Sequence, residues 1–76
     1  MIDTIFPIDA KDQAGNALYC DDRIQNRYGS TYIFVGCFSR LHNSSYNDVA
    51  LVYNCQTDEW ELKNPDWLRQ VLLILD

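Results

Sequence analysis

The sequence predicts a small α+β domain, in which an antiparallel sheet of three to five strands carries a C-terminal α-helix packed on one face. Two observations predict this class. Residues 31–63 contain segments rich in β-branched and aromatic side chains, separated by polar turns. Residues 64–75 then place apolar side chains at helical spacing behind a helix-start signal. A chain of 76 residues has the length of one domain, so residues 1–76 are expected to form a single compact unit.

The two central strands come from the middle of the chain. Residues 31–38 are apolar on both alternating faces, which predicts a strand covered on both sides. Residues 40–47 are polar and predict a loop. Residues 49–53, from Val49 to Tyr53, are again apolar and predict the second strand.

The third strand is predicted at residues 59–63, after a turn at residues 56–58. Its charged and apolar side chains alternate strictly. We therefore expect Trp60 and Leu62 to face the core, because one face of an antiparallel sheet is usually solvated. The charged residues of the strand are then expected to face water: Glu59, Glu61 and Lys63.

A helix is expected to follow this strand. Asn64 is a good N-cap, Pro65 suits the first helical position, and Asp66 suits the positive end of the helix dipole. The apolar side chains that share one helical face are Trp67, Leu68, Val71, Leu72 and Leu75. We expect this face to pack on the sheet, with Trp60 and Leu62 against Trp67 and Leu72.

The first thirty residues give a weaker pattern. Residues 13–16 have the composition of a turn, which predicts a hairpin between residues 4–9 and residues 17–21. A short helix over residues 9–14, ended by Gly15, is the alternative.

Cysteine usage and hydropathy indicate a cellular compartment. The three cysteines are odd in number and follow no secretion signal, so we expect reduced thiols. The longest apolar run, residues 71–75, is far below the roughly 20 residues that span a bilayer. The sequence therefore predicts a cytoplasmic protein, in the host cytoplasm if a phage encodes it, that does not bind membranes.

Candidate chemical groups are few. Cys37, His42 and Cys55 are zinc-ligand types, but they lack the spacing of a zinc knuckle, and no third group orients a Cys–His pair for catalysis. Glu59 and Glu61 share a strand face about 6.5–7 Å apart, a spacing seen in inverting glycosidases, but so short a chain offers no cleft. We predict no catalytic residues, no metal and no cofactor, and hence no enzyme.

The charges are segregated along the chain, whose net charge is −5. Residues 1–22 carry five Asp and one Lys, residues 23–47 carry three Arg and no carboxylate, and residues 48–76 carry six carboxylates and two basic residues. An acidic chain is unlike proteins that bind nucleic acid directly, because affinity for phosphates comes from Lys and Arg. The basic block predicts at most one small patch, formed by Arg23, Arg27, Tyr28 and Arg40, or internal pairing of these arginines.

A compact acidic domain without a cleft is best explained as a protein that binds another protein. Its carboxylates would attract a basic partner and raise the association rate. Proteins that bind nucleic acids have such basic surfaces. The carboxylates expected to contact the partner form three groups, with the last one as the leading set: Asp9 and Asp12; Asp21 and Asp22; Asp58, Glu59, Glu61 and Asp66.

In size, charge and these acidic clusters, the chain resembles short acidic phage proteins that disarm host defence, including anti-CRISPR and anti-restriction DNA mimics. The resemblance implies an inhibitor that blocks a nucleic-acid-binding host protein or complex by placing carboxylates where phosphates would lie. Two alternatives stay open: an immunity protein or antitoxin that masks a basic toxin, and a structural or assembly subunit. The protein is expected to be a monomer or a homodimer.

Overall fold

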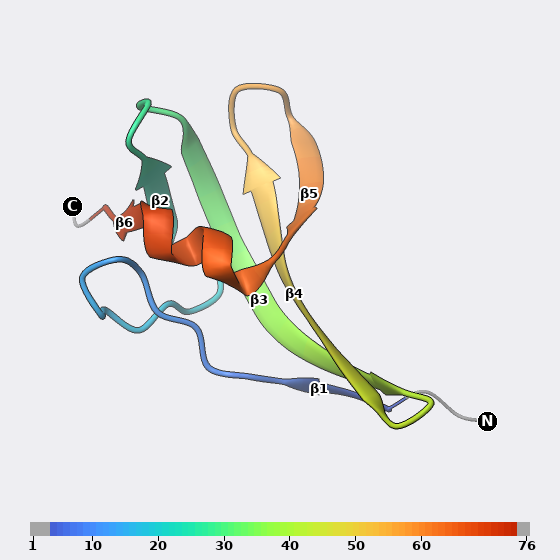
Figure 1. The fold of residues 1–76 in the computed structure, drawn as a ribbon. Coiled ribbons are helices and arrows are strands. Elements are labelled where there is room, and N and C mark those ends of the chain that lie inside the picture. The colour runs from blue at the N-terminus through green and yellow to red at the C-terminus, as the bar shows by residue number, and fades with distance from the viewer. Residues whose placement is uncertain (1–3, 75–76) are drawn as a thin grey trace.

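The structure, a computed structural model, describes residues 4–74 (Figure 1). These residues form one six-stranded antiparallel sheet and one short 3-10 helix, η1. In chain order the elements are β1 (Thr4–Pro7), β2 (Arg23–Asn26), β3 (Thr31–His42), β4 (Ser45–Asn54), β5 (Glu59–Lys63), η1 (Pro65–Gln70) and β6 (Val71–Leu73). The predicted α+β class is therefore wrong: among the described residues the protein is mainly β and has no α-helix.

The sheet has the strand order β5-β4-β3-β2-β6, and β1 pairs with β3 outside this path. Both β1 and β2 use the same edge of β3. β2 pairs with residues 31–33 at its start, and β1 pairs with residues 38–41 toward its end. In Figure 1, β1 accordingly runs beside the far half of the β3–β4 hairpin, away from β2.

The predicted loop at residues 40–47 is wrong, because β3 and β4 continue through it to form one long hairpin. The hairpin turns at Asn43 and Ser44, whose φ angles are 49° and 64°. A two-residue turn with both residues at positive φ matches the twist of its strands, so polar residues on either side stay paired. The hairpin stretches the molecule to 43 × 26 × 18 Å, with a radius of gyration of 12.9 Å against about 11 Å for a compact chain of this length.

A β-bulge interrupts this hairpin between Phe34 and Gly36. A bulge bends its strand and changes which side chains face the core. A Cβ atom built on Gly36 would lie 2.7 Å from Cζ of Phe38, so the Phe38 ring occupies the space that a side chain at residue 36 would need. Glycine leaves room for the tip of this ring against the backbone beside the bulge.

The predicted C-terminal α-helix is a 3-10 helix of six residues followed by a strand. The start signal is right: the Asn64 side chain accepts a hydrogen bond from the backbone N–H of Asp66 at 3.0 Å, and Pro65 opens the helix. The chain then leaves the helix, because residues 71–73 pair with the free edge of β2. A short apolar run suits either a helix or a strand, and here an unpaired edge is available to it. Leu75, which completes the predicted helical face, lies outside the described residues.

The core lies between the sheet and η1, which crosses one face from the β5 side to the β6 side (Figure 1). We call this covered side the inner face and the opposite side the outer face. The buried apolar side chains of the core are Leu18, Ile24, Tyr32, Phe34, Cys37, Ala50, Val52, Leu68 and Val71. Trp67 is half-buried and meets the Tyr32 ring edge-on, with 4.9 Å between ring centroids.

The orientation predicted for β5 is reversed. Trp60 and Leu62 are 64% and 69% exposed and lie on the outer face, so they do not pack against Trp67 or Leu72. The register explains this result, since Glu61 lies opposite Val52, a core residue, and Lys63 lies opposite Ala50. β5 is an edge strand, where an inward-pointing charged side chain still reaches solvent past η1.

The predicted N-terminal hairpin does not form, because Thr4–Pro7 pairs with β3 instead. A turn does form at residues 13–16, closed by an isolated bridge between Lys11 and Ala17, and the alternative helix over residues 9–14 is absent. Within residues 4–74, no helix has the length and apolar character needed to cross a membrane.

Candidate protein-binding surfaces

The exposed carboxylates Asp58 and Glu59 lie at the β4–β5 turn. Asp58 has a φ of 56°, which holds the turn tight, and its carboxylate accepts a hydrogen bond from the Tyr53 hydroxyl at 3.0 Å. This hydrogen bond, followed by desolvation and the Asp58 charge, raises the pKa of Tyr53. Asp58 is thereby held beside an aromatic side chain of the outer face.

Glu61 is less exposed than Asp58 and Glu59, its neighbours in the predicted set. It points to the inner face, half-buried, where Lys63 lies 2.8 Å away and the Asn54 amide donates a hydrogen bond at 2.8 Å. The interaction with Lys63, and then that with Asn54, lowers the pKa of Glu61. Among described residues this is the one ion pair between two charged side chains. The charge of Glu61 is therefore partly neutralised within the protein.

Asp58 and Asp66 lie beyond opposite ends of β5, which is itself roughly 13 Å long. The leading set of four carboxylates is therefore spread along one edge and does not meet at one point. Asp66 instead lines a surface hollow of about 480 Å³ between η1 and residues 9–15, together with Asp9. Lys11 and Arg69 line the same hollow, so its charges are mixed.

Asp12 is 4% exposed, and its carboxylate stabilises the fold through hydrogen bonds. One carboxylate oxygen accepts the backbone N–H groups of Ala14 and Asn16, and the other accepts the backbone N–H of Leu73 and the Asn16 amide. Desolvation acts to raise the pKa of Asp12, but these hydrogen bonds together lower it. Its charge is used inside the protein, where a partner would not reach it.

Asp21 and Asp22 lead into β2. Asp21 is exposed and has a φ of 74°, and its backbone N–H bonds the Phe34 carbonyl at 2.8 Å. Asp22 is half-buried, and its carboxylate accepts the backbone N–H of Tyr19 at 2.7 Å. Of this pair, Asp21 has the more accessible carboxylate.

The three arginines of the basic block do not form one patch. Arg23 lies on the outer face of β2, since its neighbour Ile24 is fully buried on the inner face. Arg27 lies at the β2–β3 turn, where its guanidinium stacks 4.9 Å from the Tyr28 ring centroid. Arg40 lies on the far half of β3. The sheet spreads these positive charges over three regions.

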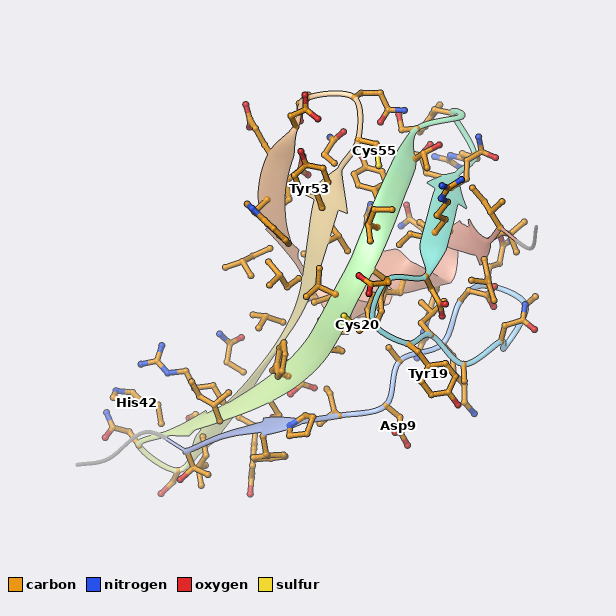
Figure 2. All side chains as sticks on the ribbon, turned by 180° about the vertical axis from the view of Figure 1, so that it is seen from behind. Asp9, Tyr19, Cys20, His42, Tyr53 and Cys55 are labelled. Atoms are coloured by element: carbon orange, nitrogen blue, oxygen red, sulfur yellow. The ribbon has the colours of Figure 1, made fainter. Side chains whose placement is uncertain are left out.

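The outer face of the sheet is the surface that the sequence analysis did not find. The strand register aligns Ile33, Tyr53 and Trp60 in a row across β3, β4 and β5. Leu51 and Leu62 form a second row beside it, and the Tyr53 and Trp60 rings meet with centroids 5.1 Å apart. Figure 2 views this face, with Tyr53 on β4 and no helix covering it. A contiguous apolar surface of this kind commonly marks an interaction site.

The sulfur and imidazole groups are dispersed. Figure 2 shows Cys55 and His42 at opposite ends of the hairpin, and Cys37 is buried between them. Desolvation, and then the charge of Asp48, raises the pKa of the Cys37 thiol. Cys55 is exposed in the β4–β5 turn. Residues 4–74 contain no group of three His, Cys, Asp or Glu side chains that could hold a metal ion.

A second hollow of about 420 Å³ lies between β3 and residues 7–20. Asp9, Tyr19 and Cys20 line it, and Figure 2 labels all three. The buried Cys37 and Lys11 also line it, but no histidine does, so the hollow lacks a Cys–His pair of the kind that nucleophilic catalysis uses. Comparison of the chain with protein-family models, curated proteins and solved structures finds no match, so its function is argued from these surfaces alone.

Proposed function

We propose that this protein is a small acidic inhibitor that binds a basic protein, of the kind that binds nucleic acids, and blocks its phosphate-binding surface. The proposal places it with the phage anti-defence proteins that its charge profile resembles, acting in the host cytoplasm. It involves no catalysis, no cofactor and no direct contact between this chain and nucleic acid. A basic target fits a chain of net charge −5, because opposite charges accelerate encounter.

One observation carries the proposal: most carboxylates are exposed and, among the described residues, are not paired with a cation. The exposed acidic residues that can face a partner are Asp9, Asp21, Asp48, Asp58, Glu59 and Asp66. Binding through carboxylates that have no internal ion pair costs less free energy, since no such pair has to be broken first. Asp58 and Glu59 are the leading pair, because they are adjacent at a rigid turn.

A role as immunity protein or antitoxin would use the same carboxylates against a basic toxin, so it differs from the main proposal in the partner alone. A role as an assembly subunit has a separate observation in its favour, the exposed Trp60 and Leu62 on the outer face. Trp is enriched among the residues that dominate binding energy in interfaces. The acidic surface and the apolar face meet at Asp58, which is hydrogen-bonded to Tyr53, and otherwise use different residues.

The test is a pull-down from lysate of the cells that carry the gene, followed by competition with duplex DNA and a salt titration. The double variant Asp58→Asn, Glu59→Gln should lose most of its affinity for the partner while its melting temperature changes little, since asparagine tolerates the positive φ at residue 58 and its amide oxygen still accepts the Tyr53 hydrogen bond. The wild-type complex should weaken steeply as salt is raised, because screening shortens the range of the attraction.

A matched control is the double variant Asp9→Asn, Asp66→Asn, which changes the net charge by the same amount at the other end of β5. Retained binding in this control would show that the turn acts as a site. Equal loss in both double variants would mean that net charge alone attracts the partner. A complex that DNA does not displace and that is indifferent to salt would refute the mimicry.

A further inference from the structure

The outer face has chemically different ends joined by an apolar centre. Across the sheet, the register aligns Arg23, Ile33, Tyr53 and Trp60 from β2 to β5. Arg23 ends the row on β2, whereas Trp60 ends it on β5, next to Tyr53 and its hydrogen-bonded partner Asp58. One end of the row thus presents a guanidinium, and the other presents an aromatic ring and a carboxylate.

These two ends are complementary to each other. A guanidinium is attracted to the face of an aromatic ring and to a carboxylate, and it bonds a carboxylate with two parallel hydrogen bonds when the geometry allows. The middle of the row, Ile33 and Tyr53, is apolar and suits burial. A row with this order matches a copy of itself laid against it in the reverse direction.

A two-fold axis parallel to the strands, between two facing sheets, produces this reversed arrangement. It places Arg23 of one copy opposite Trp60 and Asp58 of the other, and Ile33 opposite Tyr53. Two sheets pack face to face at about 10 Å with strand directions within about 30° of each other, and their side chains interdigitate. Every contact then occurs twice, as a two-fold interface requires.

We infer that the outer face binds the outer face of a second copy of this chain, forming a two-layer β-sandwich dimer. Leu51 and Leu62 extend the apolar contact beside the central row. A standard interface takes about 800 Å² from each partner, which is roughly one seventh of the 5416 Å² surface of this chain. Four strands about 4.8 Å apart and about five residues long span roughly 19 by 17 Å, less than this standard, so the dimer is expected to be weak and to form reversibly as concentration rises.

This inference does not rest on the proposed function. The acidic pair at residues 58 and 59 lies at the end of the hairpin, and Glu59 points to the inner side, away from the dimer contact. The chosen axis preserves the strand direction, so both acidic turns lie at the same end of the dimer. Because Asp58 faces Arg23 of the other copy, the dimer would offer Glu59 of each turn to a partner, whereas the monomer would offer both carboxylates.

The first experiment measures mass by sedimentation over a wide range of protein concentration. The wild-type chain should shift from monomer to dimer, and Leu62→Lys should raise the dissociation constant at least about tenfold by burying a charge in the contact. Leu62 is exposed, so this substitution leaves the fold intact, which circular dichroism verifies. Leu72→Lys is the matched control. Its register with Gln25 puts Leu72 on the outer face too, but on β6, beyond the four strands that the proposed axis overlays, so it should leave dimerisation unchanged.

The second experiment tests which residues face each other. Arg23→Asp and Asp58→Arg should each weaken the dimer, because each places like charges together, and the double variant should regain most of the wild-type affinity. A chain that stays monomeric at every concentration overturns the inference. So does a dimer that tolerates Leu62→Lys, which would point to pairing along an edge strand, or an outer face that binds only a different protein. Failure of the double variant to recover would overturn the proposed axis.

Discussion

The carboxylate of Asp12 accepts a hydrogen bond from the backbone N–H of Leu73 at 2.8 Å, across 61 residues of sequence. The same side chain organises the turn at residues 13–16 through Ala14 and Asn16. One buried carboxylate therefore fixes an early loop and connects it to the last strand of the described chain, β6.

Replacing Asp12 with asparagine separates these two roles. Asparagine keeps one acceptor oxygen for the turn but replaces the other, which bonds Leu73, with an amide donor. A buried backbone N–H without a partner costs about 1–3 kcal/mol, so we expect Asp12→Asn to lower the free energy of unfolding by about 2 kcal/mol. Urea denaturation measures this loss in the free energy of unfolding. Asp9→Asn, at an exposed position nearby, is the control and should change nothing; an equal loss in both variants would refute the role given to Asp12.

The stability difference between wild type and Asp12→Asn should depend on pH. The folded pKa of Asp12 lies below its ordinary value of 3.8, so its contribution is fully present above that value. The contribution is lost as the pH falls through the lower, folded pKa. Denaturation at a series of pH values should show the difference narrowing below about pH 4. A difference that stays constant down to pH 2 would mean that the carboxylate charge is not what stabilises the turn.

Gly36 and Phe38 should be coupled energetically. Gly36→Ala places a methyl group against the Phe38 ring and should cost about 1–3 kcal/mol, as overpacking does. In a Phe38→Ala background the same change meets open space and should cost much less. A double-mutant cycle measured by thermal unfolding gives the coupling directly. Additive changes in the free energy of unfolding would show that the Phe38 ring moves aside at no cost in stability.

The two tryptophans should differ in their effect on folding. Trp67→Ala removes a half-buried ring that contacts Tyr32 and the core, and should cost about 3 kcal/mol. Trp60→Ala removes an exposed ring whose contact with Tyr53 is worth about 1 kcal/mol. Melting temperatures at low protein concentration, where the chain is monomeric, compare the two. A larger loss for Trp60 would contradict its place on the outer face.

The strands of the middle region follow from local pattern, and their ends do not. The apolar stretches at residues 31–38 and 49–53 lie in β3 and β4, as predicted. The polar residues between them join the strands because Asn43 and Ser44 adopt positive φ and make a two-residue turn. Composition alone predicts a loop for the same residues. The N-cap at Asn64 can be predicted from the local sequence. The strand after η1 cannot, because it forms by pairing with the free edge of β2, which is distant in the sequence.

The candidate site was harder to predict than the fold. Strict alternation in β5 reveals two faces but does not say which one the core will occupy. The register with β4 decides this, and the interactions of Glu61 with Lys63 and Asn54 make the charged side tolerable inside. For the same reason the outer face, with Trp60 and Leu62, could not be recognised from sequence. Asp12 resembled any other surface carboxylate until its contact with Leu73 was known.

The pairing of β6 with β2 has a consequence for the order of events during synthesis. Until the ribosome has released Val71–Leu73, β2 lacks a neighbour on one edge and the Asp12 carboxylate lacks its long-range donor. The core therefore cannot form before these residues emerge, because η1, which covers Ile24 and Phe34, comes directly before β6. Contacts between distant segments also slow folding itself. A nascent chain of this protein is expected to become resistant to proteases in one step, after β6 has emerged.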